Sequence, residues 1–179
     1  MATELDVLRI VSERLEQQGL AFMLTGSFAL AYYATPRMTR DLDIVVALGA
    51  AQVDRLVQVF SADFYVDADA ARIAAQTERP FNLLHLESGI KVDLIVRQSS
   101  EFRRLEFERR IPVQVAGVRT WIASREDLIL SKLVWARDAD SELQLRDVRA
   151  LLHESVDLAY VQRWAENLGV TAQLRAVSR

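Results

Sequence analysis

Residues 24–46 read LTGSFALAYYATPRMTRDLDIVV, a stretch that joins a Gly-Ser turn to two aspartates spaced i, i+2. In an extended strand, alternate side chains point to the same face. Asp41 and Asp43 are therefore expected to emerge together, while Leu42 and Ile44 turn into the core. Two carboxylates on one face of a strand supply the oxygen ligands that a divalent metal ion prefers.

The Gly-Ser pair, Gly26 and Ser27, follows a short buried strand expected at residues 21–24 and precedes a helix expected at residues 27–34. Glycine lets a ligand approach the backbone closely. Ser27 can cap the helix or donate to an anion, and the N–H groups at a helix N-terminus favour phosphate. Most such turns only cap a helix, so the phosphate interpretation depends on the acids downstream.

A third acid, Asp93, interrupts the apolar strand expected at residues 90–96, which a tight turn connects to a strand at residues 81–86. A lone carboxylate is costly to desolvate there unless it is paired or bound to a metal. An ion pair with an arginine is one explanation, and metal binding is the other. The presence of three such acids in this order favours the metal.

In this order, the residues resemble the nucleotidyltransferase superfamily that includes DNA polymerase beta, the aminoglycoside nucleotidyltransferases and the minimal nucleotidyltransferases. The pattern of that family is a Gly-Ser turn, an Asp-x-Asp on the next strand and a later acid on an adjacent strand. Here the pattern falls on Gly26 and Ser27, on Asp41 and Asp43, and on Asp93.

The segment before the acids, with Arg37 and Thr39, looks most like the branch of abortive-infection, AbiEii-like toxins. The second half of the chain is similar to the helical segment of the same branch. A helix is expected to begin at Ser124, with acids in its first turn, and a helix at residues 141–152 follows it. Arg146 and Asp147 are expected on an exposed, ion-paired face of that second helix.

Lys132 stands out because it is one of only two lysines among 22 basic residues. Its stem could cover apolar surface while its ammonium stays in water. Alternatively, a compact ammonium suits a phosphate or braces the carboxylates. Both interpretations are open at this point.

The hydrophobic spacing predicts an α/β (α+β) fold, in which a mixed β-sheet is flanked by helices and followed by a C-terminal helical segment. We expect a core at residues 1–110, and a β-hairpin with helices at residues 111–179 that packs on it. The expected helices span residues 4–18, 51–60, 68–75, 102–109, 124–136, 141–152 and 157–168, and the remaining strands span residues 64–66, 113–115 and 118–122.

The composition narrows the functional classes. The 179 residues are 51% hydrophobic, which suffices for a buried core, and the net charge of −3 gives no overall attraction for nucleic acid. The absence of cysteine excludes disulfides and zinc–thiolate sites. The two histidines, His85 and His153, have no metal-ligand spacing. No apolar run reaches membrane-spanning length, and the N-terminus lacks a signal-peptide pattern, so the cytoplasm is the expected location.

The resemblance implies a metal-dependent nucleotidyltransferase that moves a nucleoside monophosphate from an NTP to a hydroxyl acceptor. Asp41, Asp43 and Asp93 would be its catalytic residues and would hold two Mg²⁺ (or Mn²⁺) ions, which stabilise an in-line displacement at the α-phosphorus. Asp93 could also accept the proton of the acceptor hydroxyl.

Gly26, Ser27 and Lys132 would bind the nucleotide. The acceptor could be RNA, protein or a small molecule, and the sequence does not distinguish them. A toxin would also have a cognate antitoxin, and a homodimer is compatible with the chain. The alternative is a non-catalytic nucleotide-binding regulatory or scaffold protein, although such a protein has no need of the complete set of acids.

Overall fold

A computed structural model of the chain describes residues 2–34, 41–152 and 155–178. Arg37 and Thr39 of the toxin-like segment, and His153, lie outside the described residues.

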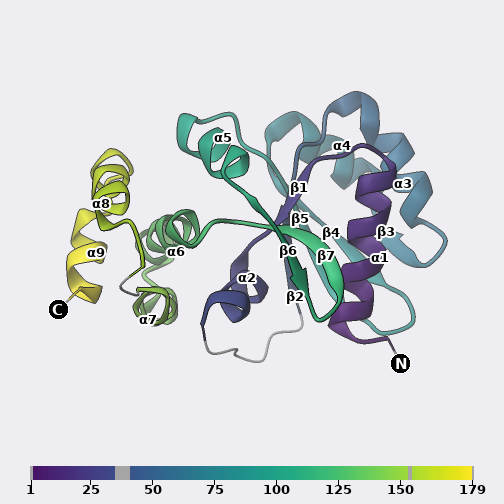
Figure 1. The fold of residues 1–179 in the computed structure, drawn as a ribbon. Helices are drawn as coiled ribbons and strands as arrows, with labels where there is room; N and C mark the ends of the chain where they lie inside the picture. Colours follow the sequence, from purple (N-terminus) through teal and green to yellow (C-terminus); the bar gives the residue numbers. More distant parts are fainter. Residues whose placement is uncertain (1, 35–40, 153–154, 179) are drawn as a thin grey trace.

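Seven strands of the described chain form one mixed sheet in the order β3-β4-β5-β2-β1-β7-β6 (Figure 1). The central strand β2 runs antiparallel to β1 and parallel to β5, and β1 runs parallel to β7. The mixed sheet predicted from the sequence is thus confirmed. The strands are β1 Phe22–Leu24, β2 Asp41–Val46, β3 Phe64–Val66, β4 Pro80–His85, β5 Lys91–Val96, β6 Ile111–Val115 and β7 Val118–Ile122.

Side chains along β2 and β5 alternate between the two faces of the sheet, and this alternation decides which residues face the site. Both strands bury their even-numbered side chains, namely Leu42, Ile44, Val46, Val92, Leu94 and Val96. Their odd-numbered residues therefore share the opposite face of the sheet. Because β2 and β5 are parallel and paired in register, Asp43 lies beside Asp93 and Val45 lies beside Ile95.

Helices cover the sheet and extend beyond it. In Figure 1, α6 to α9 gather on one side of the molecule, and α1, α3 and α4 lie on the other. Each predicted helix is present within a few residues of its expected bounds. The helices are α1 Glu4–Gln17, α2 Gly26–Tyr33, α3 Val53–Phe60, α4 Ala68–Thr77, α5 Glu101–Glu108, α6 Arg125–Ala139, α7 Glu142–Leu151, α8 Leu158–Asn167 and α9 Thr171–Val177.

The helix α9 was not predicted from the sequence. This helix has seven residues, and only Leu174 and Val177 are buried, so it carries too short an apolar pattern to be recognised. It packs against α6, α7 and α8. The predicted helix start at Ser124 is confirmed, since the Ser124 side chain accepts a hydrogen bond from the backbone N–H of Asp127.

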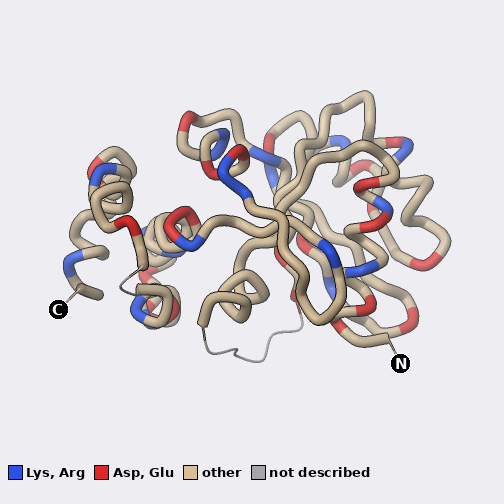
Figure 2. The backbone as a smooth tube through the Cα atoms, viewed as in Figure 1, with Lys and Arg blue, Asp and Glu red and all other residues tan. Residues whose placement is uncertain are grey.

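The hairpin of β6 and β7 belongs to the same sheet as the acids, because Leu24 of β1 pairs with Ile122 of β7. The proposed boundary at residue 110 therefore separates β1–β5 from β6–β7 within one sheet, and it stays a prediction. Figure 2 shows basic and acidic residues interspersed along most of the helices, whereas α2 carries neither. None of the described helices is long and apolar enough to cross a membrane.

Candidate active site

The three predicted aspartates come from two neighbouring strands. Asp43 of β2 pairs with Asp93 of β5, and Asp41 pairs with Lys91 one step earlier in the same register. All four are odd-numbered and lie on the face opposite the core. The side chain of Asp93 is 22% exposed and that of Asp41 is 54% exposed, so the cluster runs from a sheltered end to an open one.

Lys91 is a member of this cluster that was not predicted from the sequence. Its Nζ lies 3.0 Å from Oδ2 of Asp93 and 3.8 Å from Oδ2 of Asp41. The hydrogen bond to Asp93 raises the pKa of Lys91, and the charges of Asp41 and Asp43 raise this pKa further. The strand pattern could have identified it, because residues 91 and 93 share one strand face and Lys91 is the only lysine besides Lys132 in the sequence.

The turn between β1 and α2 presses against Asp43. The backbone N–H of Thr25 donates to the carbonyl oxygen of Asp43 at 2.8 Å. Gly26 has a φ of +62°, and a Cβ built on it would lie only 2.0 Å from Oδ2 of Asp43. Glycine is therefore required at position 26 both for its backbone conformation and for the space that the carboxylate occupies.

Ser27 lies in the first turn of α2 and is buried. The expectation that Ser27 itself could be the N-cap is wrong, because the helix begins at Gly26 and Thr25 occupies the N-cap position. Thr25 makes no side-chain capping bond. The turn thus places small residues and the start of α2 next to the carboxylate of Asp43. A phosphate bound by the N–H groups at the start of α2 would then lie beside a metal held by this carboxylate.

Asp43 is in an environment that disfavours its ionised form. Burial raises the pKa of Asp43, and the negative charges of Asp93 and Asp41 raise it further, against the opposing effects of Lys132 and Lys91. The cluster therefore carries more negative charge than its lysines neutralise. An added cation would relieve this repulsion.

The residues fit a divalent metal in their chemistry, since three carboxylates from adjacent strands are the donors that Mg²⁺ and Mn²⁺ prefer. Within residues 2–34, 41–152 and 155–178, however, no three acidic or histidine side chains are arranged as a ready-made metal site. Lys91 instead contacts both Asp41 and Asp93.

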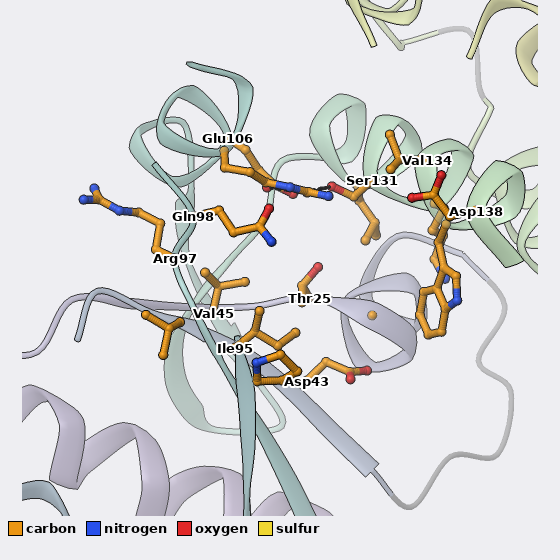
Figure 3. A pocket seen from close by; sticks show the side chains of 17 residues that line it. Thr25, Asp43, Val45, Ile95, Arg97, Gln98, Glu106, Ser131, Val134 and Asp138 are labelled. Carbon is orange, nitrogen blue, oxygen red and sulfur yellow. Dashed lines mark hydrogen bonds and ion pairs between the residues drawn. The ribbon is translucent and has the colours of Figure 1, made fainter. Parts of the chain in front are cut away.

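A cavity of about 530 Å³ opens beside Asp43, between the sheet and helices α5 and α6 (Figure 3). Its floor contains Val45 and Ile95, and Thr25 lies with Asp43 at one end. Trp135 lines it from α6 and is 51% exposed. The predicted site residues Gly26, Asp43 and Lys132 thus line one cavity, whereas Ser27, Asp41 and Asp93 are not among its lining residues.

Lys132 is buried, so the interpretation as a surface residue is wrong. Its side chain is 2% exposed, and Nζ donates to Oδ2 of Asp147 at 2.8 Å and to Oε1 of Gln144 at 3.0 Å. Asp147, expected on an exposed face, is buried as well, whereas Arg146 is exposed. The charge pattern of the helix predicts a solvated Asp147. In the fold, Asp147 is buried between α6 and α7, because the buried ammonium of Lys132 needs a carboxylate partner there.

A second polar group on the cavity wall was not predicted. Oε1 of Glu106 accepts from Oγ of Ser131 at 2.5 Å, and Oε2 accepts from Nη1 of Arg103 at 2.9 Å. Figure 3 shows Glu106 and Ser131 across the cavity from Thr25 and Asp43. Burial raises the pKa of Glu106. No sequence pattern singled out this group. Arg103 and Glu106 are an i, i+3 pair within α5, but Ser131 comes from α6, which meets α5 only in the folded chain.

The chain matches the family "Nucleotidyltransferase of unknown function (DUF6036)" over residues 4–175. No curated protein matches it. Among solved structures, it is similar to an antigenic nucleotidyltransferase-like protein from Paracoccidioides brasiliensis, at 15% identity and a TM-score of 0.57, covering 97% of this chain and 93% of that one.

Two further solved structures share the fold as well. One is ANT(2")-Ia in complex with adenylyl-2"-tobramycin, at 12% identity and a TM-score of 0.60, with 93% of this chain and 96% of that chain covered. The other is the lincosamide antibiotic adenylyltransferase LnuA with lincomycin bound, at 15% identity and a TM-score of 0.53, with 84% and 96% covered. At such identities the likeness shows the fold alone. The match over nearly the whole chain shows more: this protein belongs to the nucleotidyltransferase family DUF6036.

Proposed function

We propose that this nucleotidyltransferase moves a nucleoside monophosphate from an NTP to a hydroxyl acceptor, with Mg²⁺ or Mn²⁺ held by Asp41, Asp43 and Asp93. The observation that carries the proposal is the fit of Gly26 against the Asp43 carboxylate, with Asp93 paired beside it. A structural ion pair has no need of a glycine at that contact, whereas a site that brings a phosphate to a carboxylate-held metal does.

Each residue has a role in the displacement. The metal, when bound, neutralises the triphosphate. Gly26, Ser27 and the start of α2 bind phosphate oxygens, and Lys132 adds positive charge from the cavity wall. The acceptor oxygen forms a bond to the α-phosphorus as the bond to the β-phosphate oxygen breaks, and pyrophosphate leaves. The Asp93 carboxylate takes the proton of the acceptor hydroxyl.

The acceptor that the cavity suits best is a small molecule with a hydroxyl group. A volume of about 530 Å³ is in the range of small-ligand sites, which is about 300–1,000 Å³. Adenylyl-2"-tobramycin and lincomycin occupy two proteins of this fold. RNA and protein are the competing acceptors, and a toxin with a cognate antitoxin would use the same chemistry on one of them. That toxin role rests on the sequence resemblance alone, and a homodimer stays a prediction.

The test is to incubate the protein with each α-phosphate-labelled NTP, with Mg²⁺ or Mn²⁺, and with cell RNA, cell protein or a small-molecule extract. We expect one fraction to acquire label, and we expect Asp43→Asn to abolish this transfer. Label that appears equally with Asp43→Asn contradicts the proposed site. Binding of NTP without transfer to any fraction supports the non-catalytic alternative instead.

A further inference from the structure

Lys91 lies among the carboxylates that are proposed to hold the metal, and it connects the two strands that carry them. Its Nζ contacts Oδ2 of Asp93 and Oδ2 of Asp41, which belong to β5 and β2. The other lysine, Lys132, is engaged by Asp147 and Gln144 across the α6–α7 contact. Lys91 therefore contacts a site aspartate on each of the two strands, whereas the charge of Lys132 acts on Asp43 from the cavity wall.

An ammonium and a metal ion compete for such oxygens. Both are attracted to the carboxylates, and they repel each other with an energy that rises steeply at contact distances. A metal that approaches Asp41 and Asp93 in the nucleotide-free protein must therefore displace Lys91 or accept its repulsion. The Lys91 side chain is 39% exposed, so it has room to move when it is displaced.

We infer that Lys91 is a resident counter-cation, which holds Asp41 and Asp93 together without nucleotide and keeps the affinity of the free protein for divalent metal low. This inference rests on the proposed function. The triphosphate brings negative charge that offsets the repulsion between Lys91 and the metal. Metal and nucleotide thus load together, and the ammonium moves from the carboxylates toward the phosphates.

The test measures Mn²⁺ binding to the full chain without nucleotide, by the electron paramagnetic resonance signal of free Mn²⁺. We expect Lys91→Met, which keeps the stem but removes the charge, to bind Mn²⁺ about tenfold or more tightly than the wild type. Arg72→Met is the matched control, because Arg72 also pairs with two carboxylates, Asp54 and Asp69, outside the site. This control is expected to leave Mn²⁺ affinity unchanged.

A second set of variants tests whether the gain in Mn²⁺ affinity arises at the three aspartates. Adding Asp43→Asn to Lys91→Met should remove the gain in affinity, which shows that the metal binds at the cluster. Lys91→Gln, which retains polarity, should give the same gain as Lys91→Met and serves if the methionine variant does not fold. An affinity of the Lys91 variants equal to that of the wild type, or lower, overturns the inference.

The proposed function is tested separately, by the stabilisation of the wild type with Mn²⁺ and a non-hydrolysable NTP analogue. If that stabilisation occurs and the Lys91 variants gain no Mn²⁺ affinity, only the role of Lys91 is wrong. If the stabilisation is absent and no variant binds Mn²⁺, the metal site itself is wrong, and the inference is overturned with it.

Discussion

At Asp43, a carboxylate that is proposed to hold the metal is unfavourable for stability. Burial and the charges of Asp93 and Asp41 raise the pKa of Asp43, which means that its ionised form is disfavoured. We expect Asp43→Asn to lower nucleotidyl transfer by about 100-fold or more, because a charge that stabilises the transition state is lost. The same variant should leave the melting temperature unchanged or raise it by about 2–4 °C, the effect of about 1 kcal/mol in a chain of this size.

Calorimetry and the labelling assay check both parts. Asp54→Asn is the control, since Asp54 is an exposed acid paired with Arg72 and should leave transfer unaffected. An Asp43→Asn protein that merely unfolds would favour a structural ion pair over a metal ligand at this position.

Gly26 provides a second prediction for a single residue. Gly26→Ala incurs the left-handed backbone cost of about 1–2 kcal/mol and also drives a Cβ into the Asp43 carboxylate. Gly19→Ala is the matched control, because Gly19 has a similar φ of +66° but nothing within 4 Å of its Cβ position. We expect Gly26→Ala to destabilise the protein more than Gly19→Ala does, and to abolish transfer. Equal destabilisation, measured by urea unfolding, would show that the carboxylate moves aside without cost.

The helices α6 and α7 are joined by the buried pair of Lys132 and Asp147, so the loss of Lys132 has two possible consequences. Lys132→Ala leaves a buried carboxylate without its lysine, which costs about 3–5 kcal/mol of stability. If Lys132 also binds phosphate, the variant additionally loses about 1.5–3 kcal/mol of NTP binding, and Lys132→Arg does not fully restore it.

A double variant separates the two roles. Lys132→Met combined with Asp147→Leu replaces the pair by apolar side chains and should recover much of the stability. It should not recover NTP binding if the ammonium contacts the nucleotide. Isothermal titration that finds wild-type affinity in the double variant would assign Lys132 to structure alone.

Another contact between elements gives a pH dependence. Arg14 of α1 donates to both carboxylate oxygens of Asp63, in the turn between α3 and β3, at 2.5 and 2.7 Å. This hydrogen bonding lowers the pKa of Asp63. The stabilisation is therefore fully present above the ordinary Asp pKa of about 3.9, and it is lost as the pH falls through the lower folded-state pKa. Asp63→Asn should melt below the wild type at pH 7, with a difference that shrinks toward pH 2. A constant difference would contradict the assignment.

The elements also show what a sequence can and cannot predict. The acids were predicted because their strand has a period of two, which local sequence reveals. The contact of Lys91 with Asp41 depends on β2 and β5 pairing in parallel across about fifty residues. The contacts of Ser131 with Glu106 and Arg103 depend on how α5 meets α6. Neither the pairing of distant strands nor the packing of helices is encoded in local spacing. The contacts of Lys91 with Asp41 and of Ser131 with Glu106 therefore appear only in the fold.

At the scale of the whole molecule, the site lies where the sheet meets the C-terminal helices. The acids come from β2 and β5, the turn of Gly26 connects β1 to α2, and Lys132 comes from α6. The contacts of α2 with both β2 and α6 connect these parts. The mixed sheet and the site face could be predicted from the sequence, whereas the cavity could not, because its walls are set by the packing of helices that follow the acids in the chain.

A ligand that binds across these parts should stabilise the entire fold. We expect Mg²⁺ with NTP to raise the melting temperature, whereas NTP with chelator should raise it far less, because the triphosphate is bound largely through the metal. At a concentration about 100-fold above Kd, mass action predicts about 2.7 kcal/mol of stabilisation. Differential scanning calorimetry measures the shift, and Mg²⁺ without nucleotide is the control. Equal shifts with and without metal would overturn the metal-bridged site, since a nucleotide held by Gly26, Ser27 and Lys132 alone would need none of the three aspartates.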